Sequence, residues 1–239
     1  LRSAARVYLE SRPFALIQSE EPNGDLVWRV RICRQVPREW SAVIGDAIHN
    51  LRSALDLLAW QLVESSSGQP TRDTCFPIGH GPPRAYEQQL QRSLAGASPA
   101  IHRFVRRLKP YTGGNAILSQ LHALDIADKH RLILVVGAAH KHVVMKMKMA
   151  VPWDSTPVEF PPIAINPADR QFPLRDGAEV FAVRAAARKS DVTPEHQVVF
   201  ELAFGEIDEV RGLPLVQTLQ SMHRHVTKIV TISEEWFFR

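Results

Sequence analysis

The sequence predicts an α+β fold in which a bundle of about four to five helices packs with an antiparallel β-sheet. Three observations support this class. Apolar residues recur at steps of three and four over about 41–64, as on the buried face of a helix. Apolar and polar residues alternate over 143–151, as in a strand. The dipeptide Asn23-Gly24, which favours a tight turn, separates two strand-like runs.

The remaining elements follow from the same periodicities. A short helix is expected over about 2–11, followed by hairpin strands at 14–17 and 26–32. Four helices are expected over about 41–64, 84–95, 99–109 and 115–136. Strands are expected over 143–151, 158–165, 178–184 and 197–204, with a last helix over about 214–237.

One α+β domain over residues 1–239 explains this order most simply, because strands lie on both sides of the helices and can share one sheet. It would contain a helical core at about 38–140, a strand-rich part at about 141–210 and the C-terminal helix at about 214–237. A division into two pieces near Lys141 is the alternative.

The composition is that of an ordinary globular protein, with 45% hydrophobic and 23% charged residues and a formal net charge of +4. Cys33 and Cys75 lack the number and spacing of a disulfide framework or a zinc site. No apolar run reaches the roughly 18 to 20 residues that span a bilayer. The expectation is therefore a cytoplasmic protein that acts without a membrane, and a homodimer is compatible with it.

Polar residues cluster on two of the expected helices. On the helix at 115–136, a ridge of three-residue steps contains His122, Asp125, Asp128 and Arg131. A helical wheel places Asp128 in the middle of an apolar face, with Arg131 beside it, and that face consists of Ile117, Leu121, Leu124 and Val135. Burial of a lone carboxylate costs several kcal/mol, so Asp128 is expected to meet a cation, hydrogen-bond donors or a metal.

The other helix, at 41–64, has a matching polar flank. His49, Arg52 and Asp56 lie together beside its apolar face, and Trp60 follows one turn later. We expect the two helices to pack side by side and to share these groups in one polar cluster.

The first functional hypothesis is metal-free acid–base cleavage of a phosphodiester such as RNA, with no cofactor. A histidine can move the proton while a cation stabilises the charge that develops on the phosphate. The expected catalytic residues are His49, Arg52, His122, Asp128 and Arg131. The expected contacts to RNA or another anionic ligand are Asp56, Trp60, Asp125, Arg103, Arg106 and Arg107.

Two alternatives remain open. The cluster can be structural, with Asp128 paired to Arg52 or Arg131 to fix helix register in a non-enzymatic module that binds a ligand or partner beside Trp60, Phe76 and the methionine-rich strand. It can also supply metal ligands for a hydrolase through Asp46-x-x-His49 and His122-x-x-Asp125-x-x-Asp128, although the two arginines would oppose a cation.

Three stretches carry a resemblance. Residues 45–56 (GDAIHNLRSALD), 108–111 (LKPY) and 124–131 (LDIADKHR) are similar to stretches of a group of uncharacterised bacterial proteins that carry similar helices. Their arginines and histidines also resemble, more remotely, those of HEPN domains. That resemblance implies a helical bundle and metal-independent ribonuclease activity of the kind found in toxin and defence systems. HEPN nucleases place a histidine after the arginine, whereas His49 here precedes Arg52.

Overall fold

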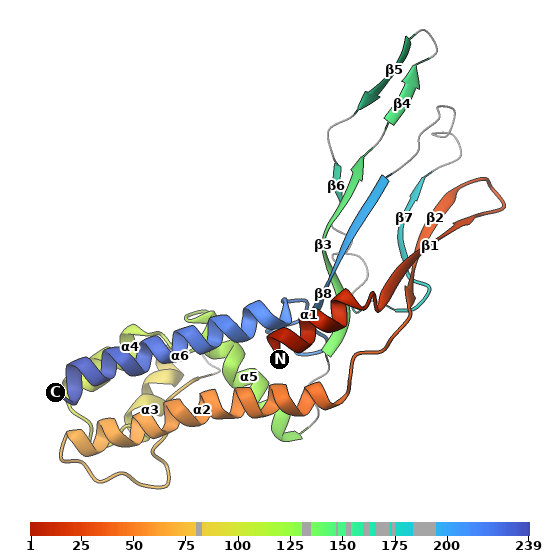
Figure 1. The fold of residues 1–239 in the computed structure, drawn as a ribbon. Helices are drawn as coiled ribbons and strands as arrows, with labels where there is room; N and C mark the ends of the chain where they lie inside the picture. Colours follow the sequence, from red (N-terminus) through yellow and green to blue (C-terminus); the bar gives the residue numbers. More distant parts are fainter. Residues whose placement is uncertain are drawn as a thin grey trace. The chain divides into compact units, whose positions relative to one another are not determined.

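The structure is a computed structural model that describes residues 1–79, 83–130, 135–146, 148–151, 154–159, 163–165, 173, 175–183 and 195–239 (Figure 1). The chain forms two compact units, one of residues 1–40, 134–205 and 211–216 and the other of residues 41–133, 206–210 and 217–239. The predicted α+β class is confirmed. The interpretation of residues 1–239 as a single domain stays a prediction.

The first unit contains one short helix and all of the named strands. Its helix is α1 (Arg2–Glu10). One sheet has the order β1-β2-β7, formed by β1 (Phe14–Glu20), β2 (Leu26–Ile32) and β7 (Glu179–Val183). A second has the order β6-β3-β8, formed by β6 (Ile163–Ile165), β3 (Val135–Lys146) and β8 (Glu195–Phe204). β4 (Lys148–Val151) pairs with β5 (Asp154–Glu159).

The hairpin of β1 and β2 forms where the sequence predicts it. Gly24 has a φ of 81°, the left-handed conformation that the turn requires and that glycine adopts without steric cost. The strands pair antiparallel from Phe14 opposite Ile32 to Glu20 opposite Leu26. Trp28 and Val30 are buried on the face that the alternation predicts.

The second unit is a bundle of helices (Figure 1). It contains α3 (Pro83–Ser93), α4 (Pro99–Arg107), α5 (Ala116–His130), and most of α2 (Glu39–Ser65) and α6 (Leu215–Phe237). The stripe predicted for α2 forms its core, since Ile44, Ile48, Leu55, Leu58 and Leu62 are all at most 3% exposed. Met222, Val226 and Ile229 are buried from α6. None of the helices in the described ranges is both long enough and apolar enough to cross a membrane.

Two sequence predictions differ from this fold. The helix expected to reach residue 136 ends at His130, and Val135 and Val136 instead pair with Phe204 and Ala203 of β8. β-Branched valines favour this strand pairing over a final helical turn. The strands were expected to share one sheet, but those that the structure describes form three antiparallel sheets. In addition, β3 begins at Val135 and not at Val143.

Helix starts in the second unit are fixed by side-chain caps. Ser98 Oγ accepts from the backbone N–H of Ile101 at the start of α4. Asn115 Oδ1 accepts from the N–H of Leu118 at the start of α5 (3.2 Å). This orients the other end of the Asn115 amide, and Nδ2 lies 2.8 Å from Nε2 of His225 on α6. Since Nδ2 is a donor, His225 Nε2 must accept, so the imidazole is neutral with its proton on Nδ1.

His225 is therefore expected to make folding pH-dependent. Burial, assisted by the nearby Lys228, lowers the pKa of His225, so the unfolded chain takes up this proton more readily than the folded one. The free energy of unfolding should fall as pH drops below about 6.5, the usual histidine value. Urea titrations between pH 8 and 5.5 should show this decline, and His225→Gln should reduce it.

His223 provides the matched control, because it lies on the same helix but is exposed. His223→Gln should leave the pH dependence of wild type intact. If the free energy of unfolding declines in His225→Gln as it does in wild type, the assignment of His225 as a neutral, half-buried imidazole is contradicted.

Candidate functional site

A buried carboxylate on α5 joins this helix to α2. Asp125 is 2% exposed, and its two oxygens have different partners. Oδ2 lies 2.7 Å from Nζ of Lys129, one turn further along α5. Oδ1 lies 3.4 Å from Nδ1 of His49 on α2. The prediction that the two helices pack side by side is confirmed at this contact.

The imidazole that contacts Asp125 is open to solvent. The side chain of His49 is 60% exposed, whereas that of Asp125 is 3% exposed. On the other side of the ring, Nε2 lies 3.5 Å from Oγ of Ser53, four residues later on α2. An ionised Asp125 can only accept, so a neutral His49 donates from Nδ1 and presents Nε2 as a base, to which the Ser53 hydroxyl can donate.

Asp128, one turn after Asp125, lies against the backbone of α2. A Cβ atom added at Gly45 would come within 2.6 Å of Cγ of Asp128, so glycine is what lets the carboxylate approach. Desolvation raises the pKa of Asp128, and the charges of Asp125 and Asp46 raise it further, while His49 lowers it. This carboxyl therefore holds its proton to a higher pH than an ordinary aspartate.

The sequence prediction that Asp128 is the buried anchor of the cluster is wrong. Asp128 is half-buried, and it is Asp125 that is enclosed. The wheel took Ile117 and Val135 as part of the apolar face. In the structure Leu118 is fully buried, Ile117 is only half-buried and Val135 belongs to β3, so the buried face of α5 is rotated from Asp128 toward Asp125.

Arg52 takes part in a separate clamp rather than pairing with Asp128. It is 8% exposed, and its Nη2 donates to the carbonyl oxygen of Phe76 (2.8 Å) and lies 3.0 Å from Oδ1 of Asp56. The same Asp56 oxygen accepts from the backbone N–H of Phe76 (2.8 Å). Burial raises the pKa of Asp56, although Arg52 and the Phe76 N–H oppose this. The clamp fixes the loop after α2 to the middle of that helix.

The other predicted residues lie apart from this contact or outside the described chain. Trp60 is 41% exposed and its Nε1 donates to Glu64 (3.0 Å). His122 is half-buried on α5. Arg131 and the methionine side chains of the strand at 143–151 lie outside the part of the chain that the structure describes.

The predicted basic cluster on α4 is partly neutralised. Arg103 and Arg107 are exposed. Arg106 donates from Nε and Nη2 to the two oxygens of Glu87 on α3, at 3.1 and 2.6 Å. These bonds lower the pKa of Glu87 to about 2. Arg106 therefore connects two helices and is a weaker candidate for RNA contact than its neighbours.

The sequence did not predict a role for three residues at the contact of α2 and α5. Ser53 follows His49 by four residues, a spacing that helix geometry could have indicated. Gly45 faces Asp128, which the wheel could not show, because it says nothing of how closely two helices approach. Lys129 follows Asp125 by four residues, the same helical spacing, and forms an ion pair with it.

The metal hypothesis finds no donor set. Among the residues described, no group of three or more His, Cys, Asp or Glu side chains is arranged to hold a metal ion.

Comparison with known proteins adds no assignment: no family model, no curated protein and no solved structure matches this chain.

The Arg52 clamp should contribute measurably to stability. Arg52→Met keeps the aliphatic stem but leaves the Phe76 carbonyl and Asp56 without the guanidinium. We expect the free energy of unfolding to fall by about 1–3 kcal/mol, the usual cost of a buried polar group left unpaired. Arg72→Met, an exposed change in the same loop, is the control and should be nearly neutral in chemical denaturation. Equal stability of the two variants would contradict the clamp.

The contact between Gly45 and Asp128 can be measured by a double-mutant cycle. Within a helix, Gly→Ala normally stabilises by about 0.5–1 kcal/mol. Here the added methyl group meets the Asp128 carboxylate, so Gly45→Ala alone should lose that benefit or destabilise. In the Asp128→Ala background the same change should stabilise. Identical effects of Gly45→Ala in both backgrounds would show that the two residues are not in contact.

Proposed function

We propose that His49, Asp125, Lys129 and Asp128 form a metal-independent acid–base site that cleaves phosphodiester bonds in RNA. One observation supports this proposal above the others, namely that an exposed imidazole is backed by a carboxylate that is almost completely buried. Such a carboxylate orients the ring and stabilises the imidazolium that forms when the ring takes up a proton. The His49 side chain is 60% exposed, so packing alone does not account for its place beside Asp125.

The proposed reaction uses two titratable groups at the contact of α2 and α5, His49 as the base and Asp128 as the acid. Nε2 of His49 removes the proton from a ribose 2′-hydroxyl, whose oxygen attacks the adjacent phosphorus. The bond from phosphorus to the 5′-oxygen breaks, and that oxygen receives a proton from the Asp128 carboxyl. The products are a 2′,3′-cyclic phosphate and a 5′-hydroxyl. Asp128, whose pKa is raised by desolvation and by its carboxylate neighbours, suits the role of the acid.

The charge that builds on the phosphate needs a cation. Lys129 is 56% exposed and shares the Asp125 carboxylate with His49, so its ammonium group can meet a phosphate held at the imidazole. Arg52, enclosed in its clamp, acts instead as a positioning residue for α2 and the loop. The resemblance to HEPN domains supports the same reaction class, in which arginine and histidine cleave RNA without a metal.

Substitution of His49 tests the proposal. His49→Ala should lower the rate of RNA cleavage by roughly 10²–10⁴-fold, because the general base is lost. Its melting temperature should change little, since the side chain is mostly exposed. The assay is cleavage of a fluorescent RNA in the presence of EDTA, and a substrate with a 2′-deoxyribose at the cleavage position should resist.

His130→Ala is the matched control, because His130 is an exposed histidine at the end of α5, the helix that carries Asp125 and Lys129. It should cleave like wild type. RNA cleavage that persists in His49→Ala, or wild-type protein that leaves all tested RNAs intact, would refute the proposed activity.

A second candidate function is a non-enzymatic binding module, favoured by one specific observation. Arg52, Asp56 and Asp125 all have partners within the protein, as expected of a device that fixes helix packing. In that case wild type would bind its ligand without turning it over, and His49→Ala would leave binding unchanged.

A further inference from the structure

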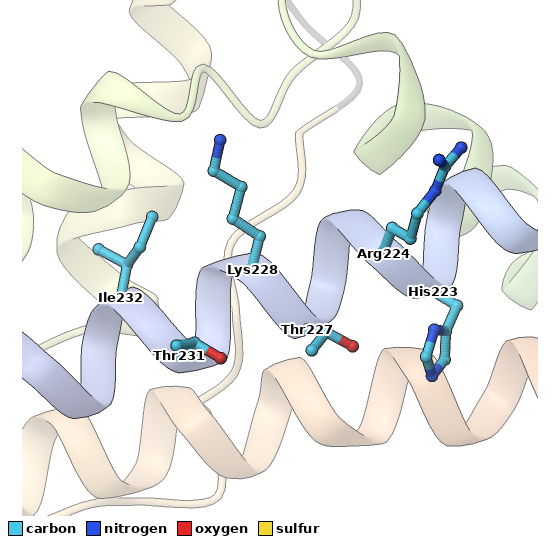
Figure 2. Close-up of a pocket in the computed structure, with 6 residues that line it drawn as sticks. All are labelled: His223, Arg224, Thr227, Lys228, Thr231 and Ile232. Atoms are coloured by element: carbon cyan, nitrogen blue, oxygen red, sulfur yellow. The ribbon is translucent and has the colours of Figure 1, made fainter.

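A groove of about 310 Å³ runs along α6, on the helical unit. Its lining residues are His223, Arg224, Thr227, Lys228, Thr231 and Ile232. Figure 2 shows Arg224 and Lys228 extending from the same side of the helix, while His223 extends from the opposite side. These residues cover about 13 Å of helix axis at 1.5 Å per residue, so the groove is longer than a single small anion.

The groove has a positive charge that the described protein does not neutralise. Within the described ranges, neither Arg224 nor Lys228 forms an ion pair with a carboxylate, and the one hydrogen bond of Arg224 goes to Ser221 Oγ (3.4 Å). By contrast, Arg106 forms an ion pair with Glu87. Glu235 follows Ile232 on the same helix, so the positive end of the groove is the one at Arg224 and Lys228.

The two cations of the groove are of the kind that binds phosphate. Arginine and lysine both pair with phosphate oxygens, and the surface between them is mostly apolar. The four-residue step from Arg224 to Lys228 advances about 6 Å along the axis. Two cations at that separation suit successive phosphates of a chain better than one compact anion. Ile232 adds an apolar surface that a ribose or base can contact.

We propose that this groove binds the phosphate backbone of single-stranded RNA. The choice of RNA over other phosphate-bearing chains rests on the proposed function, whereas the phosphate chemistry rests on the groove itself. Arg224 and Lys228 each hold one phosphate.

Binding is measured with a fluorescein-labelled 12-nucleotide RNA by anisotropy, in the His49→Ala background so that the RNA stays intact. Adding Arg224→Ala and Lys228→Ala should weaken binding about tenfold or more. It should also reduce the slope of log K against log salt by about 1.4, which is 0.7 for each of two phosphates on a single strand. Both residues are exposed, so thermal melting should be unchanged.

The matched control is Arg72→Ala with Arg92→Ala, which removes the same two charges from exposed positions of the same unit. It should bind like the parent, and so should Arg224→Lys combined with Lys228→Arg, which keeps both charges. Equal weakening in the Arg72/Arg92 control would show a general charge effect and overturn the site. So would unchanged affinity after loss of Arg224 and Lys228, or no RNA binding by the parent.

Competitors distinguish the sources of phosphate. Unlabelled RNA should displace the probe, whereas inorganic phosphate or a nucleoside monophosphate at the same phosphate concentration should not. Displacement by inorganic phosphate would assign the groove to small anions, and equal displacement by polyglutamate would reject recognition of phosphate. Because binding is read without turnover, loss of cleavage in His49→Ala with binding retained separates this inference from the proposed activity.

Discussion

The organisation of the candidate site depends on keeping one carboxylate charged while it is almost completely buried. Asp125 meets this condition with two cationic or proton-donating partners, Lys129 on its own helix and His49 on α2. A buried carboxylate without a partner is unfavourable, so Lys129 and His49 stay within reach of it. The direction of the His49 ring toward α5 follows from this constraint.

The second constraint is the close approach of the same two helices. Gly45 presents no side chain to Asp128, so a carboxylate that would normally seek water lies against helix backbone instead. Desolvation, together with the charges of Asp125 and Asp46, raises the pKa of this carboxyl. One helix contact thus combines an exposed imidazole with a carboxyl whose pKa is raised, and the Arg52 clamp holds the adjoining loop in place.

Much of the fold could be predicted from the sequence, because its signals are local. The apolar stripe of α2, the Asn23-Gly24 turn and the alternation in β8 each depend on neighbours within a few residues. The end of α5 could not be predicted in this way, since Val135 and Val136 become a strand only through pairing with β8, nearly 70 residues away. Division of the strands among three sheets has the same non-local origin.

The sequence predicted which helices form the candidate site and most of its residue types. It did not predict which of these residues contact one another. Helical periodicity brought His49 and Asp125 into one cluster, yet it assigned the buried position to Asp128 because the wheel included a valine that is not helical. The partner of Arg52 is a backbone carbonyl 24 residues away, and any residue type could supply it. Only the tertiary fold separates the Arg52 clamp from the His49 contact.

The tautomer of His49 tests this account most directly. If Asp125 accepts from Nδ1, the neutral imidazole must have its proton on Nδ1 and leave Nε2 free as the base. Nitrogen-15 NMR of the neutral histidine side chains, recorded at alkaline pH, should therefore show protonated Nδ1 and unprotonated Nε2 for His49, and Asp125→Ala should abolish this preference. A ring protonated on Nε2, or the same tautomer with and without Asp125, would contradict it.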